Sequence, residues 1–325
     1  MKGGIMSRKL FPVLILIIMA VSFASADDLV LTLTTDGAYY PYADPVPAAS
    51  GNRFAKITGP YDGVEARTTF GAAYTIPVPF GDGPLVSGNT LVLKGTAELS
   101  PISIKPGISF SLTPIAFLVF SGGAEIASGW DIAGLIGAGA YNEATHSYDT
   151  VGTFKSCWTN AWFEGMFQFD LAAIIPGEWN HVVTQDSFRV SHTSLAGQPD
   201  DMPFLWQNSA NKINGWSYLA TFTLGYQMPL VLNTVAVQAE ISGRFDDPLN
   251  PKYAGYKSDY TMYAVNPVLI FKFSEHDSLT TLFNFSTRRG YSTVLNPETQ
   301  SAMDLTVTGL EWNFYRVAVS WKHTF

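Results

Sequence analysis

The side chains of this sequence that could act on solutes are charged groups placed at every second position of apolar segments. Residues 234–245 show the pattern, because Gln238, Glu240 and Arg244 alternate with Val237 and Ile241. Neighbours on a strand point to opposite faces, so the charged groups of such a segment share one face. A wet face with charges of both signs can filter solutes. The candidate set is Glu65, Arg67, Lys94, Glu98, Lys105, Glu164, Asp170, Arg189, Glu240, Arg244, Arg288 and Arg316, with Gln168, Gln185, Lys272, Glu311 and Lys322 as further polar positions.

These charges have two interpretations. They could line a water-filled pathway, or opposite charges could pair across a narrow lumen and fill it. Side chains close a barrel of about eight strands, whereas 16–18 strands leave an aqueous channel. A barrel of intermediate size leaves both interpretations open.

Catalytic chemistry has little support in the sequence. His146 and Glu143 are three residues apart in a loop segment, which is too small a ligand set for a metal. His192 follows Ser191, but neighbours on one strand face opposite ways and cannot form a dyad with each other. The remaining histidines show no nucleophile, base and orienting group together. We therefore expect no enzyme activity, no catalytic residue, no cofactor and no metal site.

Composition indicates which elements position these charges. Hydrophobic residues make up 47% of the 325 residues, aromatic residues 14% and charged residues 14%. Charge is well below the usual quarter of a soluble domain. The formal net charge of −8 argues against nucleic-acid binding, and one cysteine excludes an internal disulfide.

The amino terminus predicts export. Lys2, Arg8 and Lys9 precede an apolar run over residues 10–21, and Ala24-Ser25-Ala26 gives a small-residue cleavage pattern. These are the parts of a secretory signal peptide. We expect cleavage before Asp27, which divides the chain into a signal peptide (residues 1–26) and a barrel domain (residues 27–325).

Alternation with a period of two predicts an all-β antiparallel transmembrane barrel. A soluble β-protein also alternates, but long strands, aromatic residues at strand ends and the contrast of short turns with long polar loops favour a barrel. Pro106 and Pro267 are unfavourable inside strands, because proline cannot donate to the ladder. Ten to fourteen strands remain open, and our interpretation uses twelve: residues 28–35, 64–77, 90–99, 104–112, 115–127, 157–172, 181–192, 216–228, 234–245, 260–273, 278–294 and 303–325. The last two are expected to extend beyond the bilayer.

The carboxyl-terminal segment resembles the last strand of outer membrane barrels of Gram-negative type. Every second residue back from Phe325 is apolar or aromatic, as at Trp321 and Val319, except His323. The resemblance implies that Phe325 is an assembly signal read by the barrel assembly machinery. Residues 113–117 and 167–170 resemble outer membrane barrels of diderm bacteria of the spirochaete type.

Together these observations predict a barrel in the cell outer membrane, surrounded by outer membrane lipid and monomeric. The function expected first is passive diffusion of small hydrophilic solutes through a narrow channel. The alternative is a structural or adhesin-like barrel that acts through its extracellular loops, which are rich in Gly, Pro, Asn, Tyr and Trp.

Overall fold

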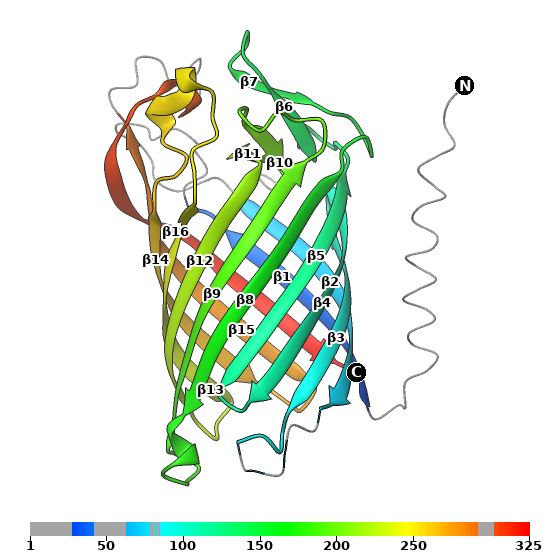
Figure 1. Cartoon of the computed structure of the whole chain (residues 1–325), viewed down its shortest axis with the longest axis vertical. Coiled ribbons are helices and arrows are strands. Elements are labelled where there is room, and N and C mark those ends of the chain that lie inside the picture. The colour runs from blue at the N-terminus through cyan, green and yellow to red at the C-terminus, as the bar shows by residue number, and fades with distance from the viewer. Residues whose placement is uncertain (1–27, 42–62, 79–80, 82, 84, 292–301) are drawn as a thin grey trace, which may run out of the picture.

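Twelve antiparallel strands close into a single barrel in the computed structural model, which describes residues 28–41, 63–78, 81, 83, 85–291 and 302–325 (Figure 1). The order around the barrel is β1-β16-β15-β14-β13-β12-β9-β8-β5-β4-β3-β2. The strand bounds are β1 Leu29–Tyr39, β2 Val64–Pro77, β3 Thr90–Ser100, β4 Ser103–Ile115, β5 Leu118–Gly129, β8 Trp158–Asp170, β9 His181–Leu195, β12 Gly215–Gln227, β13 Leu232–Arg244, β14 Met262–Lys272, β15 Asp277–Tyr291 and β16 Val307–Thr324.

The predicted all-β barrel is thereby confirmed, and each of the twelve predicted segments overlaps one barrel strand. Neighbours in sequence pair along the barrel, and β1 closes the ring on β16 with Thr32 opposite Thr324. The long β15 and β16 continue as a paired extension beyond the other strands (Figure 1).

Pro106 and Pro267 both lie inside barrel strands, as the strand assignment required. Each is paired on one side only: Pro106 lies opposite Ala97, and Pro267 lies opposite Val237. On the other side the ladder is interrupted, between Ile104 and Gly107 of β4 and between Val265 and Val268 of β14. A proline has no N–H to donate, so it is tolerated where one neighbour does not need that bond.

The outer surface of the barrel is apolar. Ile108, Leu224 and Val237 are more than half exposed, at 63%, 63% and 51%. Trp216 and Tyr226 stand near opposite ends of the outer face of β12, as aromatic girdles require. Among the described residues, no helix has the length and apolar character needed to cross a membrane.

The two ends of the barrel differ, and we name them by their connections. The turn end carries the connections β2–β3, β4–β5, β8–β9, β12–β13 and β14–β15, and the loop end carries the others. The short 3-10 helix η2 (Leu171–Ala173) lies in a connection at the turn end. In single-chain outer membrane barrels the short turns face the periplasm, whereas the longer loops face the exterior.

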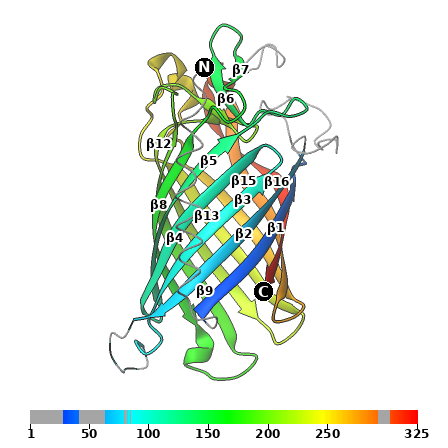
Figure 2. The ribbon, with the colours of Figure 1, turned by 90° about the vertical axis from the view of Figure 1, so that its right-hand side faces the viewer.

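The loop end carries a structure that the sequence did not predict. The sequence predicts long polar loops at residues 128–152 and 195–215. They contain β6 (Ala138–Asn142), β7 (Ser147–Thr150), β10 (Phe204–Trp206) and β11 (Ser209–Lys212), which form a four-stranded sheet above the barrel (Figure 1; β6 and β7 also in Figure 2). The next loop contributes the 3-10 helix η3 (Pro251–Tyr256), and η4 (Ala302–Asp304) precedes β16.

The four-stranded sheet, η3 and η4 together cover the loop end of the barrel, and we call them the cap. Apolar side chains stabilise the cap. One buried cluster joins Ala127, Leu195, Phe204 and Trp206, with Trp158 stacked on Trp206 at 5.4 Å. A second cluster joins Tyr141, Tyr253, Tyr256 and Met303 with their neighbours. The hydrophobic core of this molecule therefore lies in the cap, because the barrel itself places its apolar side chains outside.

Some predictions fall outside the described residues. These are the signal peptide at residues 1–26, its cleavage before Asp27 and most of the loop at residues 38–62. They stay predictions.

Candidate functional site: the inner wall of the barrel

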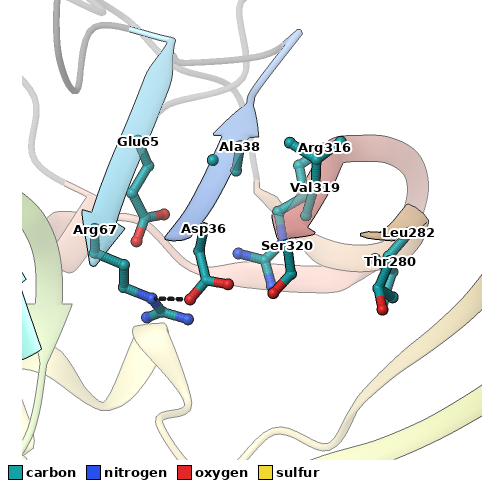
Figure 3. A pocket seen from close by; sticks show the side chains of 11 residues that line it. Asp36, Ala38, Glu65, Arg67, Thr280, Leu282, Arg316, Val319 and Ser320 are labelled. Atoms are coloured by element: carbon teal, nitrogen blue, oxygen red, sulfur yellow. Dashed lines mark hydrogen bonds and ion pairs between the residues drawn. The ribbon is translucent and has the colours of Figure 1, made fainter. Parts of the chain in front are cut away.

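The inner wall encloses a cavity of about 160 Å³ between β1, β2, β15 and β16 (Figure 3). Charged side chains line it, namely Asp36, Glu65, Arg67 and Arg316, beside Thr280. This volume has room for about five water molecules. Much of the lining is apolar, as at Leu282 and Ala318, but its charged side chains can hydrogen-bond water.

A row of ion pairs crosses the wall from β1 to β5 near the loop end. The Nε of Arg67 lies 2.9 Å from Oδ2 of Asp36 and 3.9 Å from Oε2 of Glu98. The same Glu98 oxygen lies 3.2 Å from Nζ of Lys105, which is 3.6 Å from Oε1 of Glu125. Each charged group in this row thus has a partner of opposite sign on a neighbouring strand.

Hydrogen bonds continue the row on the other side of β1. The Tyr40 hydroxyl donates to Oε2 of Glu65 at 2.5 Å and accepts from Nη1 of Arg316 at 3.0 Å. On β14, Asn266 donates to Glu240 at 2.9 Å and accepts from Asn284 at 2.5 Å. We call this bonded row of the inner wall the charge belt: Asp36, Tyr40, Glu65, Arg67, Glu98, Lys105, Glu125, Glu240, Asn266, Asn284 and Arg316.

A separate pair lies on β8 and β9. Glu164 accepts from Nε of Arg189 at 2.9 Å, and the Arg189 guanidinium lies 4.3 Å from the centre of the Trp162 ring. All three side chains share one face, because Glu164 is opposite Arg189 and Trp162 is two residues from Glu164. The aromatic face and the carboxylate together fix the arginine against the wall.

Three candidate residues lie away from the middle of the wall. Asp170 ends β8 at the turn end, where it caps η2 and lies 2.7 Å from Nδ1 of His181. Arg244 ends β13 and donates to the carbonyl oxygens of Ile213 and Asn214. Arg288 pairs with Glu311 at 3.1 Å in the extension of β15 and β16. Their contacts stabilise the ends of the barrel.

The half of the inner wall near the turn end carries three lysines that do not belong to the charge belt. Lys94 lies four residues into β3 from the turn end, and Lys322 lies two residues before the end of β16. Lys272 ends β14, and Ser278 of β15 stands between it and Lys322. Within the described part of the chain, none of these three ammonium groups lies in an ion pair.

The cap approaches the wall. Nε2 of Gln207 donates to the Ser103 hydroxyl at 2.7 Å, which joins the β10–β11 turn to the start of β4. Lys212 ends β11, where its side chain is exposed. The sheet therefore adds an exposed positive charge above the barrel, which sequence reasoning missed.

Ion pairs also join parts of the cap. Nδ1 of His146, in the β6–β7 turn, lies 2.9 Å from Oδ2 of Asp304 on η4. Lys252 of η3 pairs with Glu143 at 2.5 Å. Both contacts tie the hairpin to the segments on the other side of the mouth.

Asp186 was also missed by sequence reasoning. It lies on β9 opposite Phe167 of β8 and Phe222 of β12. It shares the face of Phe188, which is 50% exposed, and stands opposite to the face of Gln185 and Arg189. Its carboxyl group therefore lies on the lipid side of the wall, and Thr184 donates to it at 3.4 Å.

The histidines that sequence reasoning examined for chemistry have structural contacts. His192 packs edge-on against Trp216 with ring centres 5.0 Å apart, and Ser191 lies on the other face of β9. Among the described residues, no group of three or more His, Cys, Asp or Glu side chains could hold a metal ion.

A closed antiparallel barrel with a polar inner wall and an apolar outer face defines a transmembrane β-barrel protein. This architecture agrees with the predicted outer membrane location.

Comparison with known proteins gives structural similarities. No family model matches the chain, and no curated protein matches it. The chain is similar to an outer membrane channel from Pseudomonas putida F1, with a TM-score of 0.43 and 9% identity over 91% of this chain and 95% of that one. It is also similar to the KdgM porin, with a TM-score of 0.37 and 7% identity over 90% and 99% of the two chains. The beta domain of the Bordetella autotransporter BrkA gives a TM-score of 0.37 and 10% identity over 91% and 98%.

Proposed function

We propose that this protein is an outer membrane channel through which small hydrophilic solutes diffuse passively along a narrow lumen. The observation that carries the proposal is the cavity of about 160 Å³ inside the barrel, which charged residues line on several strands. A lumen that was only packed shut would have side chains in place of this space.

In this proposal the candidate residues on the wall have distinct roles. The charge belt places fixed charges of both signs at the outer entrance, where they select solutes by charge and size. Glu164 and Arg189 narrow the lumen from the opposite side of the wall. Lys94 and the other turn-end lysines face solutes that leave toward the periplasm.

The test is the conductance of the refolded protein in planar lipid bilayers. Ohmic steps are expected, and Ala318→Trp on β16 should lower their amplitude, because Ala318 lines the cavity. Val317→Trp is the matched control, because Val317 is next to Ala318 on the strand and its side chain faces lipid. A folded, heat-modifiable protein that gives no steps would contradict the proposal.

A second candidate function is an interaction barrel that acts through its extracellular loops. The ordered cap favours it, because Ile132 and Phe154 are exposed there, at 53% and 49%. Silence in bilayers together with a folded barrel would favour this function.

We propose further that Phe325 acts as an assembly signal and that the barrel is monomeric. Phe325 is 64% exposed, and its N–H donates to the carbonyl of Leu31 at 3.0 Å. An exposed aromatic side chain at the chain end is available to the assembly machinery. Deleting Phe325 should lower the amount of folded protein in cells, whereas Lys322→Gln should not. Equal amounts of both would contradict this role.

A further inference from the structure

We propose that the turn-end half of the lumen contains a binding site for small oxyanions, carboxylates and phosphates, formed by Lys94 and Lys322. The inference deepens the proposed function, because it names the class of solute that the channel would favour. It rests on the contacts of these two side chains.

The path of the Lys94 side chain is the first observation. Lys94 projects from β3, and its Cε lies 3.3 Å from the place where a Cβ of Gly71 on β2 would stand. The Thr32 hydroxyl of β1 lies 2.6 Å from the same place. The Lys94 side chain therefore crosses β2 at Gly71, because glycine has no side chain that would block it, and it extends toward β1.

Lys322 approaches from the other side of β1. It stands opposite Thr34 of β1, which shares a face with Thr32. The two lysines thus approach the threonine hydroxyls of β1 from its two sides, on the same inner face.

The two lysines have no ion-pair partner in the described part of the chain. Along the wall, the carboxylates above it are Asp36 and Glu98, and both are bonded to basic residues of the charge belt. Like charges held together without a counterion repel each other, so an anion that enters between them is stabilised by both. Hydroxyl groups add neutral donors, which suit the oxygen atoms of a carboxylate or phosphate.

Lys272 extends the positive potential toward the periplasmic mouth. It stands in the same row as Lys322, with only Ser278 of β15 between them. An anion passing toward this end would meet positive charge on three strands.

The test separates binding from conduction. Binding of inorganic phosphate to the refolded full-length protein in detergent micelles is measured by phosphorus NMR, and conductance is measured on the same preparations. Lys94→Gln and Lys322→Gln should each weaken phosphate binding about tenfold or more, as the loss of a charge-assisted hydrogen bond implies. Lys155→Gln, in an exposed loop at the loop end, is the matched control and should bind like the original protein.

Gly71→Ala tests the geometry without changing the charge. A methyl group at this position would meet the Thr32 hydroxyl and displace Lys94, so phosphate binding should weaken while the net charge stays the same. Phosphate binding that is equal in the original protein and in the Lys94→Gln/Lys322→Gln double variant would overturn the site, and so would its absence from the original protein. A silent protein that still shows lysine-dependent binding would contradict the channel and support the site.

Discussion

The two halves of the inner wall differ in how their charges are partnered. Near the loop end Arg67, Glu98 and Lys105 are joined by ion pairs across three strands. Near the turn end Lys94 and Lys322 lie on either side of the β1 threonines without an ion-pair partner among the described residues. The difference teaches that charge on a barrel wall can have two uses: paired charges join neighbouring strands, and unpaired charges are, in the function we propose, available to solutes.

The largest change in the free energy of unfolding is expected where a charge is placed on the lipid face of a barrel strand. Val237→Arg should lower the free energy of unfolding by about 2–4 kcal/mol, because it exposes a guanidinium to hydrocarbon. Gln238→Arg should cost far less, since Gln238 bonds Thr223 and Asn266 on the polar face. Equilibrium unfolding in phospholipid vesicles measures both, and similar losses would refute the assignment of faces on which the comparison depends.

Breaking the charge belt should have the next largest effect. Glu98→Ala removes the shared partner of Arg67 and Lys105 and should lower the free energy of unfolding by about 1–3 kcal/mol. Glu311→Ala is the control, because its pair with Arg288 is half exposed and should contribute about 0–1 kcal/mol. The same unfolding measurement compares the two variants. An equal loss in both would mean that the belt is not structural.

Removing the charge from the lipid face should raise stability. Asp186→Leu should increase the free energy of unfolding by about 1 kcal/mol, since acidic groups on the lipid face cost less than basic ones. Gln185→Leu, the neighbour on the inner face, should give no such gain. If Asp186→Leu destabilised the barrel in vesicles, its carboxyl group would have a stabilising partner in the membrane.

The smallest effect is expected at the turn-end lysines. Lys94→Ala and Lys322→Ala should change the free energy of unfolding by less than about 0.5 kcal/mol, because neither ammonium group has an ion-pair partner among the described residues. Urea titration of the refolded variants checks this. A loss as large as that of Glu98→Ala would place these lysines in the structural half of the comparison.

Much of the barrel could be predicted because its signal is local. In residues 234–245 alternation alone separates Val237 from Gln238, and the register with β12 then follows from the short turn that joins the two strands. The partners of the charges could not be predicted, because Arg67 and Glu98 meet only through the pairing of separate strands. Asp186 was missed because Thr184, Gln185, Asp186 and Ser187 are all polar, so alternation is lost there.

The cap escaped prediction for another reason. Its strands are only three to five residues long, and β6 consists of Ala-Gly-Ala-Tyr-Asn, which has no alternating pattern. Such short strands depend on packing against Phe204 and Trp206 from a distant loop. The strand propensity of a short segment does not predict a contact with a distant loop.

The first and last barrel strands lie side by side, with Thr32 opposite Thr324 and the Phe325 N–H bonded to Leu31. A short linker from Phe325 to Asp28 could therefore make the ring continuous, and the chain could be opened instead in the turn before Asp277. Such a circular permutant would keep each strand pair of the wall while it moved Phe325 from the end of the chain to its interior. The proposed role of Phe325 in assembly could then be tested separately from the architecture of the barrel.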